Sequence, residues 1–369
     1  MNYINLLPEQ SYVDTTWYKR IVSGINSELK PNKEKIKFIN KDDISSLKED
    51  DILIIIGFTE IFISEAIQKC IQNHVRPLLV GSNPKTEINN NVSCVTINRE
   101  NAMYENVTNL YNSGAKRIAM IGINPSVNTD VAHMNGYIMA TVAHGTTHYK
   151  QDIFYNTTTI DDTIDNFIKR YKQYDAVVCT NDYVAILLLS KLNQLGIKVP
   201  DELSITGTGN TEVSAFTNPP LTTISIPLDL AGSRAATLYR ILQSDKAITS
   251  LYSTFEYKII YRQSTKVDVD RLDCNNQTTE NFTPLIDSDY EKAMKPIWSL
   301  SDTYSTIDDT DKQILEGIIN DLSNDQIAQN TFIGKSTLTY RLNRLYQMTN
   351  TSGKEELKNL ILKFFPNFK

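Results

Sequence analysis

The chain has 369 residues and a formal net charge of −6, with 41% hydrophobic and 22% charged residues. This composition is typical of a soluble globular protein and excludes a largely disordered chain, and the length predicts two or three domains. The longest apolar run, Ile52–Phe58, is too short to cross a bilayer, and no signal peptide is visible at the N-terminus. The cysteines are too scattered to indicate disulfides: Cys70, Cys94, Cys179 and Cys274. We therefore expect a cytoplasmic protein with no membrane partner.

Short apolar runs alternate with amphipathic helical patterns along residues 1–265. The apolar runs resemble strands that are buried on both faces, and they are Tyr3–Leu7, Ile36–Ile39, Asp51–Phe58, Pro77–Val80, Arg117–Ile123, Ala176–Cys179 and Leu203–Ile205. The helical patterns between them are Trp17–Leu29, Glu60–Gln72, Asn101–Asn112, Thr163–Tyr171, Tyr183–Leu195 and Leu228–Leu242. This order predicts an α/β fold in which parallel sheets carry helices on both faces.

Ligands of such folds bind beyond the carboxyl ends of the strands, so the strand exits are the places to search. These exits carry polar and aromatic side chains, at Pro8–Tyr12, Gly57–Thr59, Gly81–Asn83, Gly122–Pro125, Thr180–Asp182 and Gly207–Thr211. The sequence contains neither a GxGxxG nor a GxxxxGK[ST] loop, which argues against a nucleotide-driven enzyme. Asn181 and Asp182 could bind vicinal hydroxyls of a ligand, or Asp182 could cap the following helix.

Several ordered motifs in this region resemble the effector-binding core of LacI/GalR-type repressors. The motifs are Leu110–Gly122, Ala176–Asp182, Leu192–Ile205, Asn218–Ile224 with Pro227, and Tyr261–Thr265. The resemblance covers about residues 2–265. It implies a periplasmic-binding-protein type I architecture, with two α/β lobes, three crossovers and a small-molecule effector such as a sugar in the cleft.

The same resemblance implies six ligand-binding residues: Trp17, Tyr18, His133, Asn181, Asp182 and Asn210. Trp17 and Tyr18 match the family's paired aromatics, one of which stacks on the sugar, but core packing would explain both equally well. His133 stands where the family has an arginine, and Gly209, followed by Asn210, stands where it has an acid. Two charged sugar contacts are thus missing or neutralised, which leaves room for a different small molecule or for no effector.

The family normally begins with a DNA-binding helix-turn-helix, whereas this chain begins at the first sensor strand. If the chain binds DNA, we therefore expect another part to do so. Residues 266–306 are acidic and weakly periodic, which predicts a linker or docking segment. Within it, a short helix that docks on a neighbour could form from Tyr290, Met294, Ile297 and Trp298.

Residues 307–369 change to short helical patterns, which are Asp311–Ile319, Asp321–Gln329, Lys335–Gln347 and Lys354–Phe365. Ser323 and Gln326 have the spacing of a capping box, and a tight turn before Lys335 fits a helix-turn-helix. Residues 307–365 resemble a LuxR/GerE-type DNA-binding domain, through Leu322–Ala328, Phe332–Ile333, Ser336–Leu338, Arg344–Tyr346 and Glu355–Leu357.

The helix Lys335–Gln347 carries three bases and no acid, which favours a nucleic-acid partner. We assign phosphate contacts to Lys335, Arg341 and Arg344. The candidates for reading base edges are Ser336, Thr339, Tyr340 and Asn343. The alternative is a solvated helix face on a small docking domain.

Metal binding and catalysis are both disfavoured. His144 and His148 have the spacing of two metal ligands on one face of a helix. However, Gly145 interrupts a helix there, and no Asp, Glu or Cys is spaced to act as a further ligand. We expect no cofactor, no metal and no enzymatic activity. The sequence predicts a ligand-responsive transcriptional regulator that binds DNA and a small-molecule effector as a homodimer. Two alternatives remain, a solute-binding protein and a degenerate sensor core that dimerises without an effector.

Overall fold

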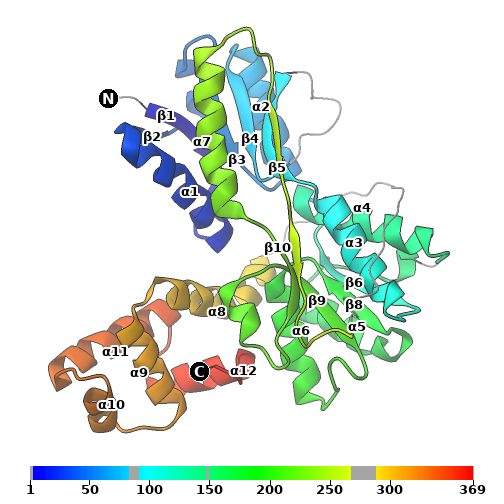
Figure 1. Cartoon of the computed structure of the whole chain (residues 1–369), viewed down its shortest axis with the longest axis vertical. Coiled ribbons are helices and arrows are strands. Elements are labelled where there is room, and N and C mark those ends of the chain that lie inside the picture. The colour runs from blue at the N-terminus through cyan, green and yellow to red at the C-terminus, as the bar shows by residue number, and fades with distance from the viewer. Residues whose placement is uncertain (1–2, 83–90, 147–148, 267–287, 369) are drawn as a thin grey trace.

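The computed structural model describes residues 3–82, 91–146, 149–266 and 288–368. Asn83, His148, Cys274 and most of the predicted linker lie outside these described residues. Two six-stranded sheets each form the centre of a lobe (Figure 1), with strand orders β11-β5-β4-β3-β1-β2 and β12-β10-β9-β8-β6-β7. Their strands pair in parallel except β10 with β12, so the predicted α/β fold with parallel sheets is confirmed.

The first lobe is built from strands β1 (Tyr3–Pro8), β2 (Lys35–Phe38), β3 (Ile52–Ile56), β4 (Arg76–Val80), β5 (Ser93–Ile97) and β11 (Tyr252–Phe255). Its helices are α1 (Thr16–Asn32), α2 (Glu60–Gln72) and α7 (Leu228–Ser244). Ile54 of β3 packs toward α1 and α7, whereas Ile55 packs toward α2. Alternate residues of this strand are therefore buried on opposite faces, which explains its unbroken apolar sequence.

Helices α1 and α7 pack unusually closely because each has a glycine at the contact. A Cβ atom on Gly24 would lie 1.9 Å from the carbonyl oxygen of Asp229, and one on Gly232 would lie 1.9 Å from that of Ile21. A larger residue at either position would push the two helices apart, so this reciprocal contact fixes how they cover the sheet.

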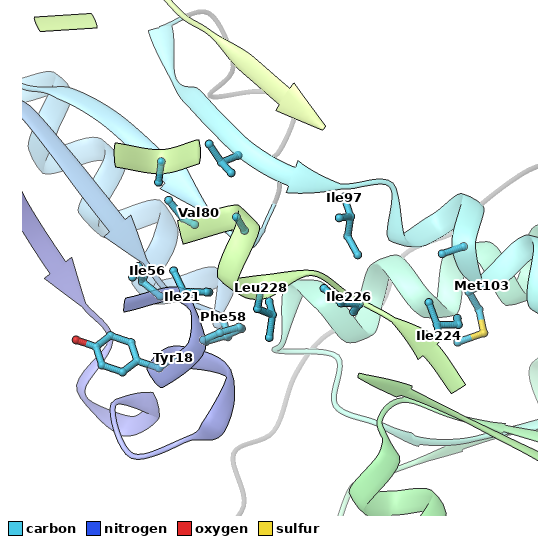
Figure 2. Packing of buried hydrophobic residues seen from close by; sticks show 14 of the residues in the cluster. Tyr18, Ile21, Ile56, Phe58, Val80, Ile97, Met103, Ile224, Ile226 and Leu228 are labelled. Atoms are coloured by element: carbon cyan, nitrogen blue, oxygen red, sulfur yellow. The ribbon is translucent and has the colours of Figure 1, made fainter. Parts of the chain in front are cut away.

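The second lobe is built from strands β6 (Ile118–Ile123), β7 (Ile153–Tyr155), β8 (Ala176–Cys179), β9 (Ser204–Gly209), β10 (Thr222–Ser225) and β12 (Lys258–Ile260). Its helices are α3 (Arg99–Asn112), α4 (Asn128–Ala143), α5 (Ile160–Ile168) and α6 (Asp182–Gln194). Within the described residues the chain crosses between the sheets after β5, after β10 and after β11. One apolar cluster follows these crossovers, and Figure 2 shows it running from Phe58 through Leu228 and Ile226 to Met103.

Within residues 288–368, the helices of the tail are α8 (Ser288–Thr306), α9 (Asp309–Ile319), α10 (Asn324–Asn330), α11 (Lys335–Thr349) and α12 (Lys354–Phe364). The predicted capping box of Ser323 and Gln326 is confirmed at the start of α10. The tail and the second lobe share one apolar cluster, in which Phe216 lies 5.5 Å from Phe368, measured between ring centroids. The tail is therefore packed against the second lobe and does not hang from it as a tethered unit.

Helix α8 lies in the segment predicted to be a linker or docking element. Its Met294 and Ile297 are buried in the shared cluster, as the predicted docking helix requires. The side chain of Tyr290 lies outside the described residues. In the part of the chain that the structure describes, no helix is both long and apolar enough to cross a membrane.

Candidate functional site

A cavity of about 490 Å³ lies between the two lobes. It collects side chains from the carboxyl ends of strands in both sheets, as parallel α/β folds require. The first lobe contributes, among others, Glu9, Tyr12, Trp17, Lys41, Phe58, Phe62 and Glu65. The second lobe contributes, among others, Asn124, Val127, Asp130, Asn156, Asn181 and Tyr183. Trp298 of the tail helix α8 completes the lining.

The two lobes contact each other directly at one rim of this cleft. The backbone N–H of Glu60 donates to the carbonyl oxygen of Ser126 at 3.1 Å, and the N–H of Asn128 donates to that of Phe58 at 2.9 Å. These bonds join the segment after β3 to the segment after β6. The cleft is therefore held closed along this edge by backbone contacts.

Two of the six predicted ligand-binding residues line the cleft, and the other four do not. Trp17 and Asn181 are both in the lining, and the side-chain oxygen of Asn181 also accepts a hydrogen bond from the N–H of Val184 at the start of α6. Tyr18 instead packs in the core of the first lobe, and burial raises the pKa of its hydroxyl. For Tyr18 the core-packing alternative is therefore the one that the structure supports.

Asp182 performs neither of the roles that the sequence suggested. Its carboxylate is fully buried and does not line the cleft. It accepts hydrogen bonds from the N–H and hydroxyl of Thr211, at 2.7 and 3.0 Å, and from the hydroxyl of Thr223 at 2.5 Å. Burial raises the pKa of Asp182 despite these donors. The residue ties α6 to β10 and to the loop after β9, and Asn181 caps the helix.

His133 and Asn210 also lie outside the cleft lining, contrary to the prediction. His133 is 1% exposed, and burial, with a smaller contribution from Arg99, lowers its pKa to about 3. Asn210 accepts a hydrogen bond from Arg262 at 2.8 Å. Gly209 has a φ of 127°, a conformation open to glycine but not to the acid that the resemblance led us to expect there.

Aromatic rings form two walls of the cleft, and among them the sequence singled out Trp17 alone as a ligand contact. In the first lobe the ring of Phe58 lies 4.7 Å from that of Tyr12 and 6.2 Å from that of Trp17, between centroids. From the second lobe Tyr183 meets Trp298 edge-on at 6.2 Å. The only sequence signal for Tyr12 and Phe58 was their position at strand exits. Trp298 was expected to dock, and its ring also reaches the cleft.

Helix α8 also bonds to the first lobe beside the cleft. The carboxylate of Asp302 accepts a hydrogen bond from the hydroxyl of Thr16 at 2.5 Å and pairs with the ammonium of Lys19 at 2.7 Å. Both partners are on α1. A single tail helix therefore contacts the cleft, the first lobe and the second lobe.

Asp130 and Asn156 are polar groups of the second-lobe wall that the sequence did not single out. One carboxylate oxygen of Asp130 accepts the N–H of Asn124 at 3.0 Å, and burial raises the pKa of Asp130 to about 7. Asn156 is 2% exposed, and its side-chain oxygen has no hydrogen-bond partner among the described residues. The wall thus offers the second carboxylate oxygen of Asp130 as a hydrogen-bond acceptor to whatever occupies the cleft.

Replacing Asp130 with asparagine should change the pH dependence of stability. The pKa of Asp130 in the folded protein, about 7, lies above its ordinary value of 3.8, so the folded state holds a proton that the unfolded chain releases. Wild-type stability is therefore lost as pH rises from about 4 to about 7. As pH rises from about 4 to about 7, the melting temperature of Asp130→Asn should increase relative to that of the wild type. Above pH 7 the difference between the two melting temperatures should stay constant. A difference that stays flat across the window would contradict the shifted pKa.

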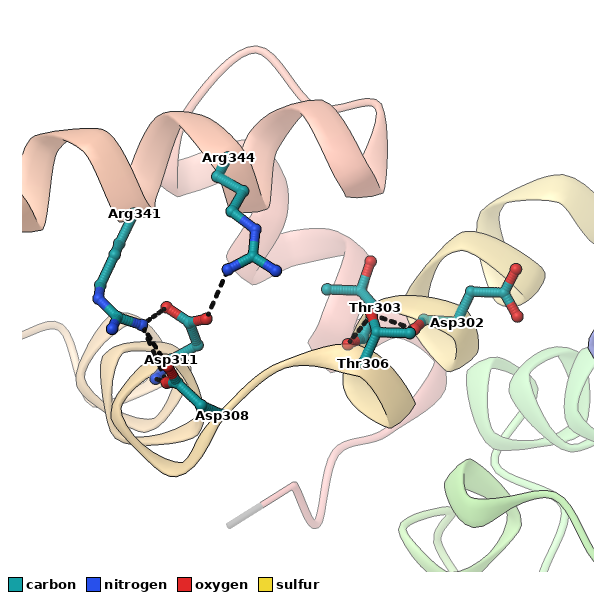
Figure 3. A network of polar contacts seen from close by, with 7 residues as sticks. All are labelled: Asp302, Thr303, Thr306, Asp308, Asp311, Arg341 and Arg344. Atoms are coloured by element: carbon teal, nitrogen blue, oxygen red, sulfur yellow. Dashed lines mark hydrogen bonds and ion pairs between the residues drawn. The ribbon is translucent and has the colours of Figure 1, made fainter. Parts of the chain in front are cut away.

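The tail carries a charged network that ties α11 to α9 (Figure 3). Arg341 pairs with Asp308 at 2.8 Å and with Asp311 at 2.7 Å, and Arg344 approaches Asp311 at 3.4 Å. The side chain of Asp311 is 0% exposed. These contacts do not support the phosphate role predicted for Arg341, because its charge already neutralises a buried carboxylate of its own chain.

The opposite face of α11 points to solvent. Tyr340 is 69% exposed, and the other exposed residues on this helix include Lys335, Ser336, Thr339, Asn343 and Arg344. Lys335 pairs with Asp325 of α10 while remaining 77% exposed. Figure 1 shows α10 and α11 at the outer end of the tail, away from the two sheets. The predicted base-reading residues are therefore accessible to a partner.

Among the described residues no group of three or more His, Cys, Asp or Glu side chains is placed to hold a metal. His144 stacks on Tyr111 at 4.5 Å, between ring centroids.

Comparison with known proteins places the chain in a family. A model for a periplasmic binding protein-like domain matches residues 107–265. The chain is 30% identical to catabolite control protein A of Staphylococcus xylosus over 251 residues, which is 68% of this chain and 73% of that protein. The chain belongs to the LacI family of transcriptional regulators.

Other LacI-family relatives agree with this assignment. The repressor CytR of Escherichia coli is 26% identical over 238 residues, or 64% of this chain and 67% of the repressor. In structure, the chain resembles the transcriptional regulator CelR in its cellobiose complex, with a TM-score of 0.63 and 19% identity over 72% of this chain and 84% of that one. This likeness confirms the LacI-type two-lobed fold. The family match does not extend to the tail, and the resemblance to a LuxR/GerE-type domain stays a prediction.

Proposed function

We propose that this chain is a cytoplasmic, homodimeric transcriptional regulator that binds a small-molecule effector in the cleft and DNA through the tail. Membership of the LacI family supports the regulatory role and weighs against an enzyme. The cavity of about 490 Å³ between the lobes supports effector binding, because it is large enough for a small metabolite. This cavity also favours an effector-binding core over the degenerate core that His133 and Gly209 suggested.

The observation that carries the DNA-binding half is the exposed face of α11. Helix α10 leads through a short turn, residues 331–334, into α11, which packs inward through Leu338, Leu342 and Leu345. Its other face presents Thr339, Tyr340 and Asn343 to solvent, and this is the arrangement of a recognition helix that enters a major groove. Lys335 and Arg344 retain exposed charge for phosphates, whereas Arg341 stabilises the tail.

Helix α8 supports a coupling between the two sites. It lines the cleft with Trp298, bonds to α1 through Asp302 and packs against α11. An effector that changes how the first lobe sits on the second would alter the contacts of Trp298 and Asp302 and so move α8. Helix α11 would follow, and a dimer would then present its two recognition helices at a different spacing.

Selection of genomic DNA fragments by the full-length protein, followed by gel-shift titration, tests this function. Sequence-specific fragments should be enriched, and the double variant Tyr340→Ala with Asn343→Ala should bind them at least about tenfold more weakly, since a good base contact contributes about 1–3 kcal/mol. Asn359→Ala removes another exposed asparagine, from α12, and serves as the control. Failure to enrich any sequence, or equal binding by all three proteins, would contradict the proposal.

A further inference from the structure

The charged groups that line the cleft are mostly acidic. Among the lining residues, Glu9, Glu65 and Asp130 carry carboxylates, whereas Lys41 carries the one ammonium group. That ammonium is already paired with Glu65. The lining therefore offers an anionic ligand no uncommitted cation, and burying an anion beside carboxylates is unfavourable.

The acidic groups differ in what they can still bind. The carboxylate of Glu9 already accepts the N–H groups of Phe58 and Thr59, at 2.8 and 3.1 Å, and the hydroxyl of Thr59. Asp130 accepts one N–H, from Asn124, through one of its oxygens. Of the acidic groups in the lining, Asp130 is therefore the one that keeps an oxygen for a ligand.

Asp130 and Asn156 are brought to the same part of the wall by backbone hydrogen bonds. The N–H of Asn156 donates to the carbonyl oxygen of Ile123 at 2.8 Å, and the next residue, Asn124, donates its N–H to Asp130. The side-chain oxygen of Asn156 is itself inaccessible from the cleft, so the second carboxylate oxygen of Asp130 is the acceptor that a ligand can reach in this part of the wall.

The cleft also has aromatic walls. Tyr12, Trp17 and Phe58 form one wall, and Tyr183 with Trp298 forms another. Aromatic faces attract cations as well as apolar groups. The buried contacts of Asp182 remove the hydroxyl-binding carboxylate that a polyhydroxylated ligand would need.

We propose that the effector of this cleft is a small organic cation. Its ammonium group bonds to Asp130, and its apolar part lies between the aromatic walls. This inference rests on the proposed effector role of the cleft and adds the chemical class of the ligand. The raised pKa of Asp130 agrees with it, because a bound ammonium would favour the ionised carboxylate and so return the stability lost by burying it.

Calorimetric titration of the full-length protein with three probes of similar shape tests the inference. The probes are 2-phenylethylamine, 2-phenylethanol and 3-phenylpropanoate, which carry a positive charge, no charge and a negative charge at pH 7. We expect the amine to bind at least about tenfold more tightly than the alcohol, because charge-assisted hydrogen bonds are about twice as strong as neutral ones. The carboxylate probe should bind weakest.

Asp130→Asn should abolish the preference for the amine, because the amide keeps the shape and an acceptor oxygen but not the negative charge. Asp161→Asn, on the exposed surface of α5, should leave all affinities unchanged. Equal binding of amine and alcohol, or an amine preference that survives in Asp130→Asn, would overturn the charge assignment but leave the cleft as a small-molecule site. If none of the probes binds, the inference is wrong, and the gel-shift experiment still decides the DNA-binding half of the proposed function.

Discussion

Asp182→Ala should destabilise the folded protein by about 3 kcal/mol even when no ligand is present, because it leaves three buried donors without an acceptor. Those donors are the N–H and hydroxyl of Thr211 and the hydroxyl of Thr223. The backbone at Gly207 also packs closely against this carboxylate. A Cβ atom at Gly207 would lie 2.4 Å from one of the Asp182 oxygens, which leaves no room for a ligand between them. The surroundings of Asp182 are therefore shaped for a structural group and not for a ligand.

Urea unfolding without ligand measures this effect, and Asp182→Asn is the matched variant. The amide retains one acceptor oxygen, so the loss of stability should be smaller than with alanine. If Asp182→Ala unfolded at the wild-type urea concentration while ligand binding was lost, the hydroxyl-binding role inferred from the sequence would be correct and the structural role would be wrong.

The two sheets could be predicted from the sequence where strands are buried on both faces. The runs that became β1, β3, β4 and β8 are short, apolar and bounded by breakers, so their local pattern is sufficient. Helix α4 was missed because it is buried around most of its circumference, and its apolar residues therefore show no helical period. Strands β11 and β12 were missed because both are short, partly exposed edge strands, which lack the continuous apolar run of a buried strand.

The candidate site was predictable in position but not in detail. The rule that ligands bind at strand exits located Tyr12, Phe58, Asn124 and Asn181 correctly in the cleft. It did not reveal that Asp182, adjacent to Asn181, points into the protein, because adjacent residues at the start of a helix face different directions. Asn156 follows the unpredicted strand β7, and Asp130 lies in the unpredicted helix α4, so neither had a sequence signal.

Arg341→Ala should reduce the stability of the tail by about 3 kcal/mol, because it leaves the buried carboxylate of Asp311 with one weak partner. That remaining partner is Arg344, at 3.4 Å. Removing Arg341 also releases Asp308, which caps the start of α9 by accepting the N–H of Asp311 at 2.9 Å. Figure 3 shows both carboxylates gathered beneath the Arg341 guanidinium.

Lys335→Ala provides the comparison that separates stability from DNA contact. It removes the same single charge from α11, but its ion pair with Asp325 is largely exposed, so stability should change by less than about 1 kcal/mol. Thermal unfolding should therefore distinguish two variants that are identical in net charge. Because the tail and the second lobe share one apolar cluster, the Arg341→Ala defect should also lower the stability of the second lobe. If both variants unfolded at the wild-type temperature and weakened DNA binding equally, Arg341 would be a phosphate contact and the network with Asp311 would be incidental.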